Sequence, residues 1–64
     1  MTPHELRAWR KAHDLSQLEL ADLLEVHAMT LSKWERGVHS IPRLVPRILA
    51  TIDRAERKGE PART

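Results

Sequence analysis

Two helix-start signals stand close together near the beginning of the chain, and they constrain its fold more than any other feature. Thr2-Pro3-His4-Glu5 combines a threonine N-cap, a proline at the first helical position and the glutamate of a capping box. Ser16-Gln17-Leu18-Glu19 repeats the capping box. The first helix is therefore predicted to run from about residue 3 to about residue 13, and a second helix is predicted to begin at Ser16.

Apolar side chains at helical spacing give the next two helices one inward face each. The second helix is expected to end near Leu24 or Glu25. A third helix is expected from 28 to 36, where Leu31 and Trp34 form an apolar stripe. Only about three residues join these helices, which is typical of a helix-turn-helix, with a plain helical hairpin as the alternative.

The opposite side of the third helix is built of small, flexible and cationic side chains. At about 100° per residue, these positions fall within one arc that faces away from the apolar stripe. They are Ala28, Met29, Ser32, Lys33 and Arg36. A hairpin that only packs has no use for such a face. Gly37 is expected to end the helix, because glycine takes the left-handed conformation at no steric cost.

The position of the last helix depends on two prolines. A proline inside a helix that starts at Pro42 would lose a backbone hydrogen bond and press on the preceding turn. We therefore expect a turn at 42–45 and a helix that begins at Pro46 and ends at Gly59.

Length and composition limit the chain to one small domain. It has 64 residues and no cysteine, so apolar packing has to hold the fold together. No strand-like alternation is present, and the expected fold class is all-α. The domain is expected at 1–58 with its helix-turn-helix core at 16–36, and 59–64, which have nothing to bury, are expected to form a flexible tail. No apolar stretch approaches the roughly 20 residues of a membrane span, so we expect a cytoplasmic protein without membrane contact.

The sequence gives little support for an enzyme or a metal-binding protein. A chain of this size encloses no deep catalytic pocket. Its four histidines have neither i, i+4 partners nor cysteines beside them. We therefore expect no metal ion, no cofactor and no enzymatic activity.

The charges are segregated, although the net charge is only +2. An acidic stretch at 16–25 precedes a basic stretch at 26–47 that contains Lys33, Arg36 and Arg43. Positive charge concentrated on one segment is what a polyanion-binding surface requires, and a merely solvated face is the alternative.

A longer pattern of residues spans the two short helices and continues on both sides. Its positions are Ser16-Gln17, Glu19-Leu20-Ala21, Leu24, Val26, Thr30-Leu31-Ser32, Trp34-Glu35 and Gly37, with Leu6 and Arg10 upstream and Pro42, Ile48, Leu49 and Ile52 downstream. This pattern resembles the lambda Cro and cI type repressors, the XRE family. The resemblance implies a lambda repressor-like bundle of four or five helices, whose third helix lies in the major groove of operator DNA, usually in a two-fold dimer.

The resemblance also implies roles for individual side chains. Base contacts are implied for Ala28, Met29, Ser32 and Lys33. A lysine donates to guanine, a serine bonds to several base edges, and alanine and methionine pack on thymine methyl groups. Phosphate contacts are implied for Ser16, Gln17, Arg36, Ser40 and Arg43.

Two further positions match family residues that stabilise the fold, and two other positions depart from the family pattern. Arg10 and Glu35 match a pair that forms an internal salt bridge, so they are expected to hold the fold rather than contact DNA. Glu25 stands where a turn glycine is common, which implies either a strained backbone or a different turn. His27 stands where a serine or threonine cap is common, and it is a weaker cap that, when protonated, could reach a phosphate.

The resulting hypothesis is a transcriptional repressor that binds an inverted-repeat operator in double-stranded DNA as a homodimer. The dimer surface is expected on the last helix and the loop before it, with candidates Ile41, Val45, Leu49 and Ile52. The alternative is an antitoxin-like or other interaction module that also binds a toxin or another protein partner. Its motivation is Trp9, Leu18 and Leu23, which the helical wheel does not clearly place in the core.

Overall fold

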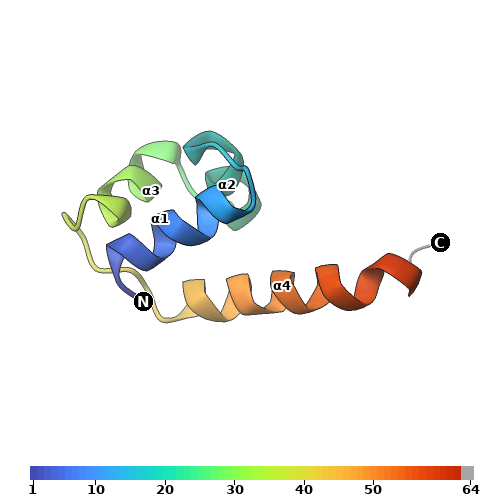
Figure 1. The fold of residues 1–64 in the computed structure, drawn as a ribbon. Helices are drawn as coiled ribbons and strands as arrows, with labels where there is room; N and C mark the ends of the chain where they lie inside the picture. The colour runs from blue at the N-terminus through green and yellow to red at the C-terminus, as the bar shows by residue number, and fades with distance from the viewer. Residues whose placement is uncertain (63–64) are drawn as a thin grey trace.

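The computed structural model describes the backbone of residues 1–62 and the side chains of residues 1–56. This part of the chain is all-helical, as predicted. Its helices are α1 (Pro3–Ala12), α2 (Gln17–Leu24), α3 (Ala28–Glu35) and α4 (Leu44–Ala62). The first three form a compact group, and α4 runs along one side of this group and projects beyond it (Figure 1). No helix in the described part is long and apolar enough to span a bilayer.

Both predicted capping boxes form. The Thr2 hydroxyl accepts from the Glu5 N–H at 3.1 Å, and the Glu5 carboxylate accepts from the Thr2 N–H at 2.8 Å. Ser16 and Glu19 make the same two bonds, at 3.0 and 2.8 Å, before α2. Each box satisfies two N–H groups that lack a partner at a helix start, and this is why α1 and α2 begin where they do.

The first three helices end in one shared hydrogen-bond pattern, the Schellman motif. Its long closing bonds run from the N–H of Leu15 to the carbonyl of Arg10, from Val26 to Ala21 and from Val38 to Lys33, at 3.1, 2.9 and 2.9 Å. The residue before each closing donor is left-handed: Asp14, Glu25 and Gly37 have φ of 56°, 58° and 77°. Glu25 therefore accepts the strained backbone, and Gly37 ends α3 as predicted.

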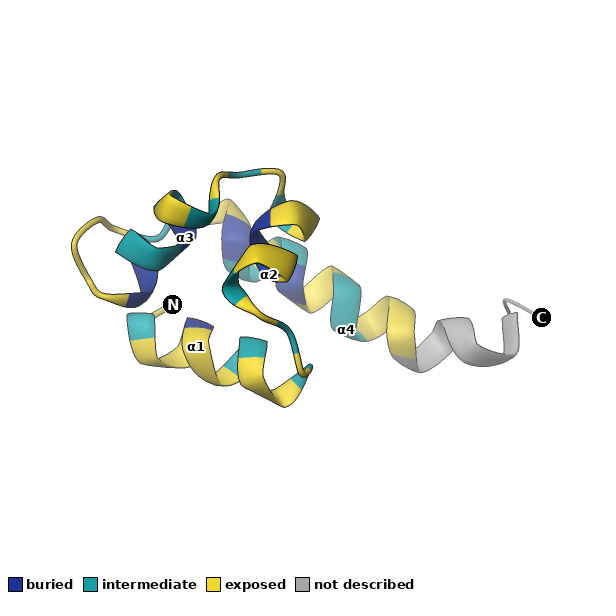
Figure 2. Ribbon diagram, turned by 90° about the horizontal axis from the view of Figure 1, so that it is seen from above, coloured by how far each residue is buried: buried dark blue, intermediate teal, exposed yellow. Residues whose placement is uncertain are grey.

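Side chains from all four helices meet in one core. The core consists of Leu6, Leu20, Ala21, Leu31, Trp34, Val45 and Leu49. In Figure 2 the buried segments of each helix face the other helices. Because α4 supplies Val45 and Leu49, the three shorter helices do not close the core without it.

The start of α4 differs from the prediction for a specific reason. The helix begins at Leu44, which places Pro46 at its third position. The N–H groups of a first turn have no acceptor inside the helix, so a proline there loses no bond. Pro42, four residues before Pro46, precedes the helix, and its carbonyl accepts from the Val45 N–H at 3.0 Å.

The predicted end of the last helix at Gly59 is also wrong, because α4 continues to Ala62. Glycine inside a helix costs only about 1 kcal/mol relative to alanine, so it does not by itself end one. The remainder of the expected tail, residues 63–64, lies outside the described residues.

Candidate nucleic-acid interface

A turn of three residues joins α2 to α3, and each of them has a defined conformation or contact. Glu25 supplies the left-handed backbone, and Val26 is half-buried and packs against the core. His27 precedes α3 with an extended backbone. The two helices are thus held as a packed unit, with Leu20 and Leu31 fully buried.

The outer face of α3 presents the residues expected to contact bases. Met29 is 63% exposed, and Ser32 and Lys33 are half-buried. Ala28 is half-buried and packs against the core, so only part of its surface faces outward. The opposite face of the helix is buried, which leaves this face as the side that a ligand could approach.

The start of α2 retains unpaired donors. Glu19 accepts from the Ser16 N–H, and Ser16 accepts from the Glu19 N–H, but the N–H groups of Gln17 and Leu18 lie in the first turn without an intrahelical acceptor. The side-chain nitrogen of Gln17 donates one bond to Glu35 at 3.1 Å. Such a helix start, with backbone N–H groups directed outward, suits an anion.

Cationic and hydroxyl side chains follow α3. Arg36, Ser40, Arg43 and Arg47 are all exposed. Within residues 1–56, neither these arginines nor Lys33 pairs with a carboxylate. Their charge is therefore not neutralised within the described side chains, which suits a polyanion better than a face balanced by acidic groups.

An ion pair joins α1 to the end of α3. Two nitrogens of the Arg10 guanidinium donate to the two carboxylate oxygens of Glu35 at 2.8 and 3.0 Å. A third nitrogen of Arg10 donates to the Leu15 carbonyl at 3.0 Å. Because Gln17 also donates to Glu35, this carboxylate connects α1, the start of α2 and the end of α3.

The protonation of the pair follows from these bonds. Burial alone would raise the pKa of Glu35, but the hydrogen bonds from Arg10 and Gln17, together with the Arg10 charge, outweigh it and hold this pKa below its ordinary value. The hydrogen bond to Glu35 raises the pKa of Arg10. Both groups are therefore charged at neutral pH, as a bidentate charge-assisted pair requires.

His27, at the start of α3, makes no side-chain capping bond. Its ring is exposed, and the first N–H groups of α3 lack the acceptor that a serine would supply. This cap is weaker than those of α1 and α2, as the residue type predicts.

Two of the four candidates for a dimer surface lie in the core. Val45 and Leu49 are only 5% and 1% exposed. Ile41 and Ile52 are half-buried against the core. The large apolar residues of this region that remain open are Val38 and Leu44, at 56% and 61% exposure.

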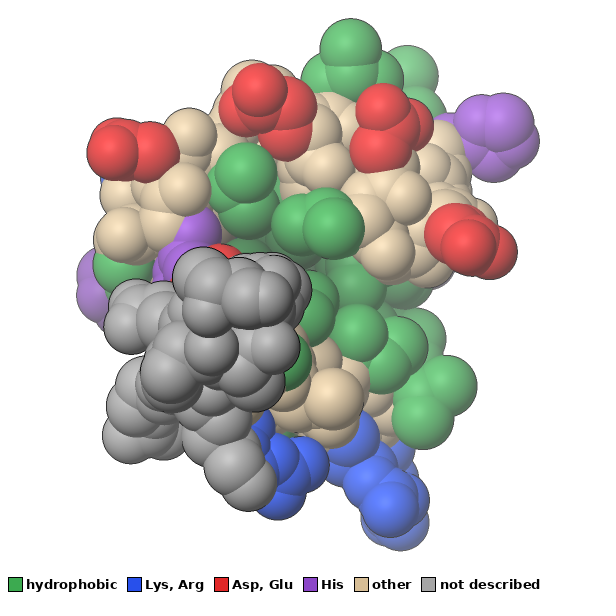
Figure 3. Space-filling model, turned by 90° about the vertical axis from the view of Figure 1, so that its right-hand side faces the viewer, with side chains coloured by type: hydrophobic (Ala, Val, Ile, Leu, Met, Phe, Trp, Pro, Cys, Tyr) green, Lys and Arg blue, Asp and Glu red, His purple; other side chains and the backbone are tan. Residues whose placement is uncertain are grey.

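The apolar patch considered for a protein partner is smaller than expected. Leu18 and Leu23 on α2 are 62% and 52% exposed, whereas Trp9 is half-buried and packs against the core. Acidic side chains run across the upper part of the face in Figure 3, with hydrophobic side chains among and below them. Such a face would suit a basic partner rather than a nucleic acid.

One polar cluster was not visible in the sequence. His13, which follows α1, meets Asp53 and Glu56 of α4. The i, i+3 spacing of the two carboxylates places them on one helix face, but only the packing of α4 against α1 brings the histidine to them.

Comparison with known proteins assigns most of this chain to a family. A family model described as helix-turn-helix matches residues 6–44, which span most of α1, all of α2 and α3 and the first residue of α4. No curated protein and no solved structure matches the chain.

Proposed function

Because this chain belongs to the Cro/C1-type helix-turn-helix family, the XRE family of DNA-binding regulator domains, we propose that it is a dimeric repressor that inserts α3 into the operator major groove. One observation carries the proposal: the outer face of α3 bears Met29, Ser32 and Lys33 opposite a buried face.

Direct base reading falls to the outer face of α3. The Lys33 ammonium donates to O6 and N7 of a guanine, and the Ser32 hydroxyl bonds to a neighbouring base edge. Met29 and the exposed part of Ala28 pack on thymine methyl groups. This set contains no amide and no arginine, so the shape of the DNA contributes to specificity.

Phosphate contacts fix the position of α3 in the groove. Ser16, Gln17 and the unpaired N–H groups at the start of α2 hold the backbone on one side. Arg36, Ser40 and Arg43 hold it on the other side. His27, exposed and without a capping bond, lies between these two groups in the sequence and contacts a phosphate through its ring.

Two copies are needed for tight selective binding, because one module of this size makes few contacts. A two-fold dimer places its recognition helices on half-sites about 34 Å apart. Leu44 and Ile48 are one turn apart on α4; Leu44 is exposed and Ile48 is half-buried outside the core cluster. These two residues form the surface that we propose for the dimer.

The test is selection of bound sequences from a random duplex pool, with the intact protein and with Lys33→Ala and Met29→Ala. We expect an inverted repeat, loss of preference for guanine at one position with Lys33→Ala, and loss of preference for thymine with Met29→Ala. Lys11→Ala, which alters an exposed lysine of α1, is the matched control and should leave the motif unchanged.

Salt dependence separates specific operator binding from weak attraction. With six to ten phosphates neutralised per dimer, the association constant should fall by roughly a thousandfold or more between about 50 and 200 mM salt. Equal affinity for every duplex, or a selected motif that neither substitution alters, would contradict the proposal.

A second candidate, a module that binds a protein as well as DNA, is favoured by exposed Leu18 and Leu23 beside the acidic residues of α2. A stoichiometric partner that co-purifies from the native host and is lost with Leu18→Ser/Leu23→Ser would support this candidate. Recovery of the homodimer alone would oppose it.

A further inference from the structure

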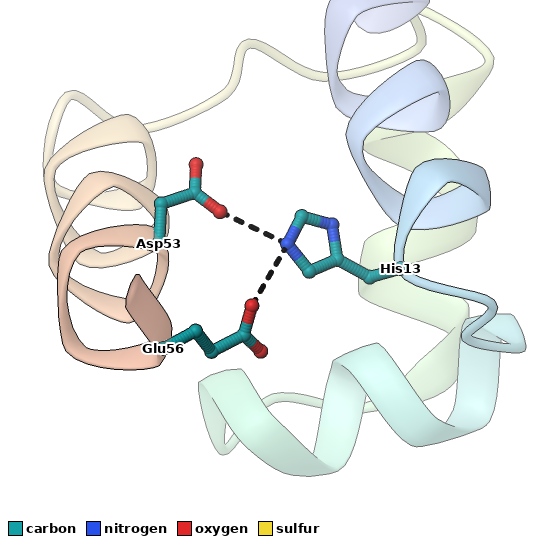
Figure 4. A group of neighbouring side chains, drawn as sticks. All are labelled: His13, Asp53 and Glu56. Carbon is teal, nitrogen blue, oxygen red and sulfur yellow. Dashed lines mark hydrogen bonds and ion pairs between the residues drawn. The ribbon is translucent and has the colours of Figure 1, made fainter. Parts of the chain in front are cut away.

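Three side chains with metal-ligating atoms meet where α1 and α4 pack together. His13 comes directly after α1, and Asp53 and Glu56 lie on the facing side of α4 (Figure 4). The Nε2 atom of His13 lies 2.9 Å from Oδ1 of Asp53 and 3.5 Å from Oε1 of Glu56. Their ligand atoms all lie within 4.8 Å of one another.

Trp9 orients two of these side chains without joining the cluster. Its backbone carbonyl lies 2.9 Å from Nδ1 of His13, and its indole N–H donates to Oδ2 of Asp53 at 3.1 Å. The Trp9 and His13 rings also stack, with centroids 3.7 Å apart and an interplanar angle of 18°. A carbonyl acceptor on Nδ1 fixes the histidine tautomer whose Nε2 lone pair can bind a metal ion, and outer hydrogen bonds of this kind are typical of metal-binding histidines and carboxylates.

The donor set selects a class of ion. One imidazole nitrogen and two carboxylate oxygens are ligands of Zn²⁺ and neighbouring divalent transition metals, whereas Ca²⁺ and Mg²⁺ prefer oxygen alone. Zn–N and Zn–O bonds of about 2.0 to 2.2 Å in a tetrahedron separate two ligand atoms by roughly 3.4 Å. The two separations from Nε2, 2.9 and 3.5 Å, lie on either side of that value.

Access and charge also suit a divalent metal ion. Glu56 is exposed with a side chain 59% accessible, so its carboxylate has room to move closer. Two carboxylates and a neutral imidazole carry a charge of −2, which balances a divalent cation. The Trp9 carbonyl, opposed by burial and helped by Asp53, raises the pKa of His13, so a proton competes with a metal ion for this ring.

We propose that His13, Asp53 and Glu56 form a binding site for one Zn²⁺ ion, or a closely similar divalent transition-metal ion, between α1 and α4. A water molecule completes the four ligands. The ion would fasten α4 to the end of α1, because His13 directly follows α1 and both carboxylates lie on α4. This proposal does not depend on the protein binding DNA.

The test is titration of the full chain with Zn²⁺ by calorimetry, with NMR of the histidine rings to identify the ligand. We expect one ion per chain, a higher unfolding temperature with Zn²⁺ but not with Mg²⁺, and a shift of the His13 ring signals. His13→Gln and Asp53→Asn should each weaken binding at least tenfold. Glu56→Gln, at an exposed position that folding does not require, should also weaken binding.

The other histidines supply the control. His4, His27 and His39 are exposed. In the triple variant His4→Gln/His27→Gln/His39→Gln, His13 is the one histidine that remains. This variant should bind Zn²⁺ as the intact protein does. The proposal is overturned if the triple variant loses the ion, if His13→Gln binds Zn²⁺ unchanged, or if Zn²⁺ binds no better than Mg²⁺.

Discussion

Glu25 holds a backbone conformation that is costly for any residue with a Cβ atom. Its φ of 58° belongs to the left-handed region, which costs L-residues roughly 1 to 2 kcal/mol. Glycine would remove that cost but would gain freedom in the unfolded chain. Glu25→Gly should therefore stabilise the protein by about 0.5 to 1 kcal/mol, measured as the free energy of unfolding in urea.

Glu25→Ala is the matched control for this prediction. It removes the same carboxylate but keeps the Cβ atom, so it should change stability little. Gly37→Ala is the converse change: at φ of 77°, the new Cβ would meet only Pro3 Cγ, at an ordinary 3.7 Å. Its expected loss of about 1 kcal/mol would be conformational rather than steric. Equal stabilities for Glu25→Gly and Glu25→Ala would show that relief of backbone strain does not stabilise the Glu25→Gly variant.

Among the helices, the Arg10–Glu35 pair joins α1 to α3, and the bond from Gln17 to Glu35 adds the start of α2. The Glu35 side chain is 1% exposed and that of Arg10 is 12% exposed. Arg10→Met would leave a buried carboxylate with Gln17 alone, at an expected cost of about 3 to 5 kcal/mol. Lys11→Met, at an exposed neighbour on α1, should cost less than about 0.5 kcal/mol.

The pH dependence of this pair has a defined sign. The folded pKa of Glu35 lies below its ordinary value of 4.5. The stabilisation is therefore complete well above that pH and is lost as the pH falls through the folded pKa. Glu35→Gln should cost about 1.5 to 3 kcal/mol at pH 7 and progressively less below about pH 4.5, measured by urea unfolding at several pH values. A cost independent of pH would mean that packing, not charge, accounts for the effect.

At the scale of elements, local signals in the sequence were sufficient to place most helix boundaries. The capping boxes at Thr2 and Ser16 and the glycine at 37 act through bonds to near neighbours, so their effects can be read from adjacent residues. Pro46 could not be placed in the same way, since a proline loses no helical hydrogen bond at either the first or the third position of a helix. The choice between them depends on tertiary contacts of α4.

For the whole molecule, stability depends on the helix that lies almost entirely outside the family match. The match ends at residue 44, whereas the core also requires Val45 and Leu49. Domains of this size seldom gain more than about 3 to 5 kcal/mol from their core. Leu49→Ala, which empties a site 1% exposed, should cost about 2 to 5 kcal/mol and leave much of the protein unfolded by circular dichroism.

Leu44 provides the contrasting prediction on the same helix. It is 61% exposed, so Leu44→Glu should leave the unfolding midpoint of the monomer nearly unchanged. In sedimentation equilibrium the same variant should be monomeric at concentrations where the intact chain is a dimer, because a charge would be placed in the proposed interface. A dimer that persists in this variant would move the interface elsewhere.

Interactions between distant parts of the chain set the limit of sequence-based prediction. Helical spacing predicts that Val45 and Leu49 share a face, but not whether that face meets the core or a second copy. The contact of His13 with Asp53 is beyond local reasoning for the same reason. The outer face of α3 could be predicted from the sequence because its composition contrasts with the apolar stripe on the same helix.

The stacking of Trp9 on His13 has an optical consequence. Of the two tryptophans, Trp34 is in the core, and Trp9 lies against an imidazole that can quench an excited indole by electron transfer. Emission from Trp9 should be dim while this stack is intact and should brighten when the ring of His13 leaves it. The protein thus carries a native fluorophore where its first and last helices meet. The packing of α4 against α1 can therefore be followed without an attached dye.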